Sequence, residues 1–149
     1  MDRVEPATHG VVVETAEDVL QRPFDLGADL CVPDTGKDLG YEPLRILPKQ
    51  HERIEAEIDG LNSELTPLRS FVLPGGHPAA AHLHLARTVC RRAERLIVEL
   101  AAEPGEHVSP GAISYVNRLS DFFFVASRWA NATSGAGDVL WVPGKTRAV

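Results

Sequence analysis

Apolar side chains recur at helical spacing in three stretches of this chain, with charged or polar residues between them. In residues 48–65 the members of the row are four, three and four positions apart: Ile54, Ile58, Leu61 and Leu65. Residues 78–102 carry a longer row: Leu83, Ala86, Val89, Cys90, Ala93, Leu96, Ile97 and Leu100. After residue 110 the row is Ile113, Val116, Leu119, Phe123 and Ala126. Each pattern predicts an amphipathic helix that buries one face.

Prolines and glycines mark where these helices begin and end. Proline suits a first helical turn at Pro78, and Ser109 before Pro110 is a typical start signal. A further helix is expected near the N-terminus, where Pro23 should kink it or make it restart. Residues 31–43 hold two prolines and two glycines and predict a surface loop. The predicted helices are 14–30, 48–65, 78–102 and 110–131.

Four amphipathic helices with mostly short links predict an all-α fold. An up-and-down antiparallel helical bundle is expected, because a shared core hides all the apolar faces. The length of 149 residues, with 44% hydrophobic and 24% charged residues, fits one globular domain. We therefore expect a single domain over 1–149, with irregular tails at 1–13 and 138–149.

The net charge of −6 argues against a nucleic-acid partner, since phosphate binding draws on a basic excess. No apolar run approaches the roughly 20 residues that cross a bilayer, and no basic segment precedes an apolar one at the N-terminus. We expect a cytoplasmic protein without a membrane partner. Cys31 and Cys90 are too few for a disulfide framework or a metal site, so we expect two buried thiols. His82 and His84 are two positions apart, which suits no helical metal pair.

Four arginines and a glutamate cluster in residues 87–95, RTVCRRAER. Arg87, Arg91 and Arg95 are spaced to share one face of a helix, with Arg92 and Glu94 beside them. Stacked like charges repel by a few tenths of a kcal/mol per pair, so an anion or a set of carboxylates is expected to face them. The alternative is a solvated face with incidental charges, which is the usual explanation of a charge run.

The flanks of this cluster carry two more motifs, FVLPGG at 71–76 and YVNRLSD at 115–121. In this order the three segments resemble the PduO-type ATP:corrinoid adenosyltransferases, and weaker similarity to the family's second helix covers 23–30. That family has five helices, of which we expect four here. The matching positions are Phe71, Leu73, Pro74, Gly75, Gly76, His84, Arg87, Thr88, Arg91, Arg92, Ala93, Glu94, Arg95, Tyr115, Asn117, Arg118, Leu119, Ser120 and Asp121.

The resemblance implies that a reduced corrinoid, cob(I)alamin, attacks the 5′ carbon of ATP, forming adenosylcobalamin and releasing triphosphate. Cobalt supplies the nucleophile, so the protein must hold a polyanionic leaving group, a task that suits arginine. The match implies catalytic roles for Arg87 and Arg91, with Arg92 beside them. It also implies that Arg91 and Asn117 contact the nucleotide, that Arg87 pairs with an acid of a neighbouring subunit, and that Glu94 holds the arginines. Mg²⁺ would accompany ATP.

The resemblance gives Phe71 a separate role. It implies that this ring lies against the corrin, displaces the lower axial base and favours reduction of cobalt. From the residues alone, an aromatic before a turn is more often buried core. We expect an open cleft beside Phe71 and Asn117. Asp121 shares a face with Asn117, where a salt bridge with Arg118 or the arginine helix is favoured over a direct ligand role.

One part of the family pattern lacks a counterpart here, which predicts an N-terminally shortened member. The family begins with a glycine-rich T-R-T-G-D-x-G segment and a helix that opens V-D-E-L-N; the nearest match is GVVVE at 10–14, with Val13 in place of the acid. Two hypotheses follow, an active adenosyltransferase and a catalytically impaired relative that carries a corrinoid or nucleotide. A third is a purely structural helical trimer. The family is trimeric, so the resemblance implies a homotrimer, with an adenosylcobalamin-dependent mutase as a possible recipient.

Overall fold

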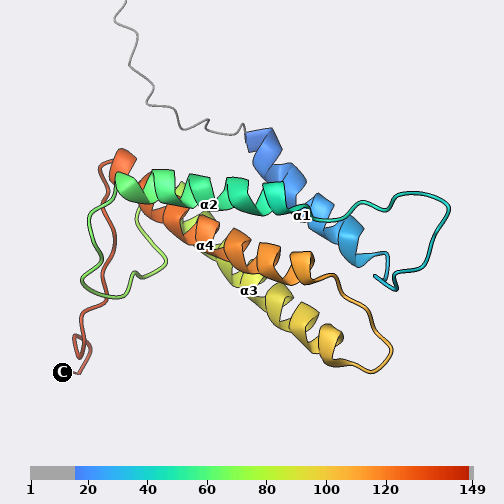
Figure 1. Cartoon of the computed structure of the whole chain (residues 1–149). Coiled ribbons are helices and arrows are strands. Elements are labelled where there is room, and N and C mark those ends of the chain that lie inside the picture. The colour runs from blue at the N-terminus through green and yellow to red at the C-terminus, as the bar shows by residue number, and fades with distance from the viewer. Residues whose placement is uncertain (1–15, 148–149) are drawn as a thin grey trace, which may run out of the picture.

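The computed structural model describes residues 16–147, which form four helices (Figure 1). Consecutive helices alternate in direction, so the predicted all-α, up-and-down arrangement is confirmed. Within the described range there is no named strand, only an isolated antiparallel bridge between Val72 and Leu140. The predicted tail 1–13, the Val13 position and the predicted helix start at Glu14 lie outside the described residues. The helices are α1 (Ala16–Leu30), α2 (Pro48–Ser63), α3 (Pro78–Ala102) and α4 (Pro110–Thr133).

The helix starts follow from local capping. The Ser109 hydroxyl accepts a hydrogen bond from the backbone N–H of Ala112 at 3.2 Å, and the proline that follows it has no N–H to leave unpaired. α3 has its predicted bounds, while α2 ends two residues earlier than predicted and α4 two residues later. α1 remains one helix through Pro23, so the chain does not restart there.

α4 is the central element of the core, because the other three helices all pack against it. Cys90 lies in this core and its Sγ donates to the carbonyl of Val116 at 3.3 Å. Burial raises the pKa of the Cys90 thiol to about 11. Cys31 is exposed, so the prediction of two buried thiols is wrong for this residue, which lies just beyond the end of α1. The core comprises Leu26, Ile46, Ile54, Cys90, Ile97, Ala112, Tyr115, Val116, Leu119 and Phe122.

One side of α3 is left uncovered. Val89 and Leu96, predicted to be buried, are 47% and 59% exposed, and Leu85 on the same side is 61% exposed. The reason is that α4 alone among the described helices packs against α3, and one helix covers only part of a wide apolar face. None of the helices in the described part of the chain is long and apolar enough to cross a membrane.

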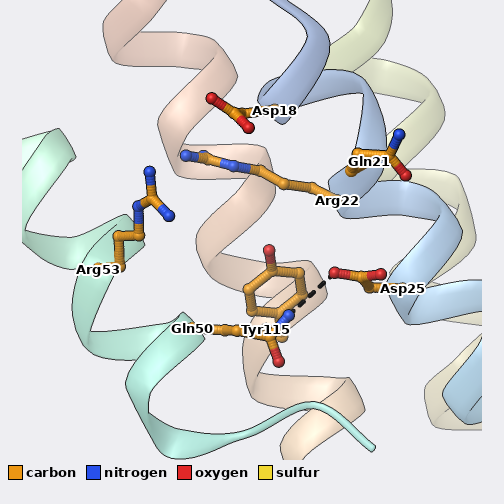
Figure 2. Close-up of a pocket in the computed structure, with 7 residues that line it drawn as sticks. All are labelled: Asp18, Gln21, Arg22, Asp25, Gln50, Arg53 and Tyr115. Atoms are coloured by element: carbon orange, nitrogen blue, oxygen red, sulfur yellow. Dashed lines mark hydrogen bonds between the residues drawn. The ribbon is translucent and has the colours of Figure 1, made fainter. Parts of the chain in front are cut away.

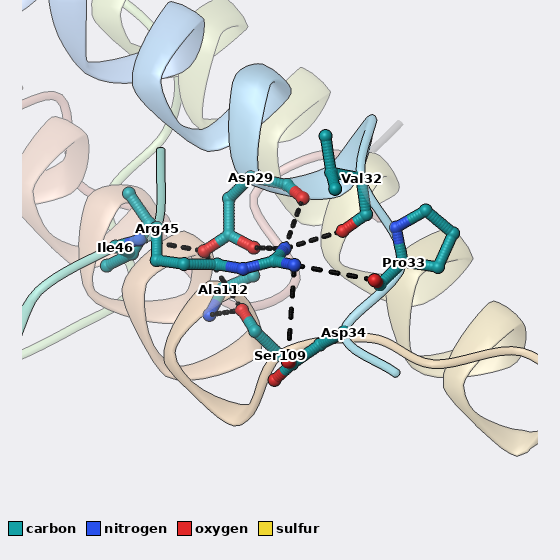
Figure 3. A network of polar contacts seen from close by, with 8 residues as sticks. All are labelled: Asp29, Val32, Pro33, Asp34, Arg45, Ile46, Ser109 and Ala112. Atoms are coloured by element: carbon teal, nitrogen blue, oxygen red, sulfur yellow. Dashed lines mark hydrogen bonds and ion pairs between the residues drawn. The ribbon is translucent and has the colours of Figure 1, made fainter. Parts of the chain in front are cut away.

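Asp29 at the end of α1 ties the following loop to the start of α4 (Figure 3). Its Oδ2 accepts hydrogen bonds from the backbone N–H of Ile46 at 2.7 Å and from the Ser109 hydroxyl at 2.9 Å. Its Oδ1 lies 2.9 Å from Nη1 of Arg45, which also donates to the carbonyls of Asp29 and Val32. This buried network fixes the position of the N-terminal end of α4.

Candidate functional site

A cleft of about 620 Å³ opens where α2, α3 and the first turns of α4 meet. Each helix contributes a polar group: His51 comes from α2, Glu94 from α3, and Asn117 and Arg118 from α4. Pro110, Ile113 and Ser114 complete the wall. The cleft therefore brings two of the predicted site residues, Glu94 and Asn117, to one surface.

Glu94 is the centre of the polar contacts in this cleft. Its Oε1 accepts a hydrogen bond from Nδ2 of Asn117 at 2.7 Å, and its Oε2 lies 2.9 Å from Nη1 of Arg91. The Glu94 side chain is 16% exposed, whereas Arg91 is 49% exposed. Oε2 is buried and makes no hydrogen bond of normal geometry within residues 16–147. Glu94 thus holds Arg91 and Asn117 in place while both remain reachable from solvent.

Arg118 closes one side of the cleft through two ion pairs. Its Nε lies 3.0 Å from Oε1 of Glu55, and its Nη1 lies 3.1 Å from Oδ2 of Asp121. The predicted salt bridge between Asp121 and Arg118 is therefore present. Asp121 does not line the cleft, so in this chain it acts on Arg118.

The remaining arginines of the cluster have no carboxylate partner in the described part of the chain. The guanidinium of Arg87 lies 4.8 Å from the centroid of the Phe124 ring, a cation–π contact. Arg92 and Arg95 are exposed, and neither forms an ion pair with a described residue. Of the four, Arg91 pairs with a carboxylate within residues 16–147, so the other three guanidinium charges are not neutralised by an ion pair in the described range.

Phe71 lies far from this cleft. It is 76% exposed, so the alternative of a buried core residue is wrong. Its loop is attached to the C-terminal part of α4, where the Asn131 amide binds the backbone of Gly75 and His77. At 1.5 Å per residue, Asn131 is about 21 Å along the helix from Asn117. Phe71 does not line the Asn117 cleft, so the expectation of one cleft beside both is wrong for a single chain.

A second, smaller hollow of about 170 Å³ lies among α1, α2 and α4 (Figure 2). Arg22 from α1 is 5% exposed, forms an ion pair with Glu57 and lies 4.6 Å from the centroid of the Phe122 ring. Gln50 donates to Oδ2 of Asp25 at 3.0 Å across it. No motif in the sequence marks Arg22, Gln50 or Glu57. These residues contact one another and link the three helices, which indicates a structural role. The cleft of about 620 Å³ is therefore the better candidate for a functional site.

Sequence reasoning also missed His51 and Ser114 in the candidate cleft. His51 Nδ1 lies 3.8 Å from Oε1 of Glu55, and no spacing in the sequence signals its approach to α4. A group of three or more His, Cys, Asp or Glu side chains able to hold a metal ion does not occur among the residues the structure describes.

Comparison with known proteins gives consistent matches. A family model described as cobalamin adenosyltransferase matches residues 3–130. The corrinoid adenosyltransferase of Mycobacterium tuberculosis is 48% identical over 124 residues, which are 83% of this chain and 62% of that protein. That of Bacillus subtilis is 41% identical over 116 residues, 78% of this chain and 56% of that protein. This chain thus spans less than two thirds of the length of these curated relatives.

Solved structures also match. A variant PduO-type ATP:corrinoid adenosyltransferase from Lactobacillus reuteri, complexed with cobalamin and ATP, aligns with a TM-score of 0.76 and 35% sequence identity. The alignment covers 85% of this chain and 66% of that chain. A second variant from the same organism, complexed with ATP, aligns with a TM-score of 0.75 and 36% identity, over 85% of this chain and 68% of that one.

Proposed function

We propose that this chain, which belongs to the cobalamin adenosyltransferase family, transfers the 5′-deoxyadenosyl group from ATP to cob(I)alamin. The products would be adenosylcobalamin and triphosphate. The observation that carries this proposal is the open cleft lined by Glu94 and Asn117, in which Glu94 also pairs with Arg91 of the arginine cluster. We also propose a cytoplasmic location for this reaction.

The residues of the cleft suit an anionic leaving group. The reduced cobalt of the substrate forms the new bond to the 5′ carbon, and the bond from that carbon to the triphosphate oxygen breaks. Arg91 offers a half-exposed guanidinium that Glu94 already orients, and Arg92 adds an exposed cation on the same helix. Charge-assisted hydrogen bonds from such forks stabilise the negative charge that develops on triphosphate. Asn117 uses Nδ2 on Glu94, which leaves Oδ1 to accept from the nucleoside.

Magnesium is proposed to enter with ATP. Mg²⁺ takes most of its ligands from phosphates and water and needs only one or two protein carboxylates. Both oxygens of Glu94 are already engaged, by Asn117 and Arg91, so the ion would be held by triphosphate oxygens and water. The ion would neutralise part of the triphosphate charge.

We also propose a homotrimer, because one chain keeps Phe71 and Asn117 apart. A site that uses both would draw them from neighbouring subunits. The exposed row of Leu85, Val89 and Leu96 on α3 supplies an apolar surface for such contact. In the trimer, Arg87 would pair with an acidic residue of the neighbouring subunit. The product, adenosylcobalamin, would pass to an adenosylcobalamin-dependent mutase. Light scattering tests the assembly, and an active monomer would exclude it.

The enzymatic proposal is tested with ATP, cobalamin and a strong reductant, following formation of adenosylcobalamin by absorbance. Arg91→Ala should lower kcat/KM for ATP by about a hundredfold or more, because one preorganised donor is lost. Arg95→Ala is the matched control, since it removes the same charge from the same helix at a position that forms no ion pair with a described residue, whereas Arg91 pairs with Glu94 of the cleft. Equal losses in the two variants, or a loss explained by unfolding, would refute the role of Arg91.

The alternative function is a carrier that binds a corrinoid or nucleotide without turnover. If the protein does not form a trimer, the separation of Phe71 from Asn117 within one chain favours this carrier function. Corrinoid binding measured by calorimetry, with no adenosylcobalamin formed under the same conditions, would establish the carrier and exclude the enzyme.

A further inference from the structure

His51 is the residue that α2 contributes to the candidate cleft. Among the described helices, α2 and α3 each pack on α4 and not on each other, so they form separate walls with α4 between them. Glu94 belongs to the α3 wall and His51 to the α2 wall. His51 also lines an adjoining hollow of about 340 Å³, which it shares with Ser114 of α4. The imidazole is therefore bordered by two hollows, from which a ligand can reach it.

A carboxylate orients the His51 ring. Nδ1 of His51 lies 3.8 Å from Oε1 of Glu55, one turn further along α2, and the His51 side chain is 27% exposed. The same oxygen of Glu55 lies 3.0 Å from Nε of Arg118, so Glu55 is itself held by α4. Nε2 is on a different edge of the ring from Nδ1 and makes no hydrogen bond to any residue within 16–147. Nε2 is therefore the atom of His51 that can bind a ligand.

The charged groups around His51 leave little positive charge on the α2 wall. Glu52 lines the adjoining hollow, and Glu55 lies beside the ring. Arg118 of α4 is the other basic side chain that lines the cleft, and its guanidinium is paired with Glu55 and with Asp121. Those two carboxylates offset the charge of Arg118. A proton on His51 therefore reduces the repulsion between this wall and an anion in the cleft.

We infer that protonated His51 binds the triphosphate of ATP from the α2 wall, which makes the affinity of the cleft for ATP depend on pH. This inference rests on the proposed function, in which Arg91 of α3 binds the same triphosphate. Arg91 is paired with Glu94, and its guanidinium keeps its charge at every pH at which the protein is folded. His51 thus supplies the titratable part of the positive charge offered to the phosphates.

The direction of the pH dependence follows from the charge of the ring. An imidazole changes its charge between about pH 5 and pH 8. The protonated ring donates a charge-assisted hydrogen bond from Nε2 to a phosphate oxygen, whereas the neutral ring offers at most an uncharged one. ATP therefore binds the protonated form more tightly, and by linkage the affinity for ATP falls as the pH rises.

Calorimetric titration of the full chain with ATP tests the inference, with excess Mg²⁺ so that the terminal phosphate stays deprotonated. Between about pH 6 and about pH 8 the wild-type Kd for ATP should rise. His51→Gln should raise the Kd by about tenfold at the lower pH and by about twofold or less at the higher pH, because glutamine carries no charge. His51→Lys keeps a charge throughout, so its Kd should change little with pH, which separates loss of charge from loss of structure.

His82→Gln is the matched control, because His82 is an exposed histidine of α3 that does not line the cleft. It should keep the wild-type Kd and its pH dependence. Inorganic triphosphate and adenosine, titrated separately, identify the part of ATP that His51 meets. His51→Gln should weaken binding of triphosphate and leave binding of adenosine unchanged.

Each contrary result has a separate meaning. A Kd for ATP that changes with pH in His51→Gln as it does in the wild type would overturn the inference. Equal weakening of adenosine and triphosphate would place His51 at the nucleoside and would also overturn it. A wild-type chain that binds no ATP would overturn both the inference and the proposed function. The expected effect of His51→Gln, in a chain that forms no adenosylcobalamin, would support the inference and refute the enzyme.

Discussion

Replacement of Asp29 by alanine tests how strongly the buried Asp29 network stabilises the fold and positions the start of α4 beside the cleft. The Asp29 side chain is 1% exposed, so water does not replace the contacts that the carboxylate makes. The change would remove the acceptor for the N–H of Ile46 and for the Ser109 hydroxyl, and would leave Arg45 without its buried partner. Ser109 caps α4, and Pro110 and Ser114 after it line the cleft.

The expected cost is large because one member of a buried pair is removed. Loss of one partner from such a pair costs about 3–5 kcal/mol of unfolding free energy. A domain of this size loses about 2–4 °C in Tm per kcal/mol, so Asp29→Ala should melt about 6–20 °C below the wild type. Urea unfolding followed by far-ultraviolet circular dichroism measures the free energy, and a thermal scan gives the Tm.

Asp34→Ala is the control, since it removes a carboxylate from the same arginine at the surface. Asp34 Oδ1 lies 4.0 Å from Nη2 of Arg45, and the Asp34 side chain is 45% exposed. Such an exposed pair contributes about 0–1 kcal/mol. If Asp29→Ala cost no more than Asp34→Ala, burial would not be the reason for the strength of this network and the argument would fail.

Three further results are expected. Gly76→Ala should lower the unfolding free energy by about 1–3 kcal/mol, because Gly76 has a φ of 94° and the added Cβ would lie 2.3 Å from the side-chain Oδ1 of Asn131. An equal loss of unfolding free energy in Gly75→Ala would contradict this. Near neutral pH a thiol reagent should modify Cys31 rapidly and Cys90 only after unfolding, because burial raises the pKa of Cys90 to about 11; a fast phase that survives Cys31→Ser would refute it. Burial first, then the nearby Arg87, lowers the pKa of His84 below 6.5, so the unfolded chain binds its proton more readily and unfolding free energy should fall as pH drops through 6.5. His84→Gln should reduce that slope, and an unchanged slope would exclude this contribution.

The sequence by itself determined the four helices and the residues at which α2, α3 and α4 begin. Pro78 and the Ser109–Pro110 pair act on the backbone within one turn, so their effect is local and can be read from the residues. The contact of Glu94 with Arg91 is also local, because three positions on a helix share a face. The family resemblance likewise rested on short motifs, and the family model matches most of the chain.

Only the tertiary structure decided which of these elements meet. The sequence placed Val89 in the core, but its exposure depends on which helices cover α3. The approach of His51 to Asn117, the distance between Phe71 and that cleft, and the contact of Phe71 with Trp141 all join segments distant along the chain. Local propensity acts over a few residues, whereas such pairings depend on how complete helices pack and how buried groups such as Asp29 find partners.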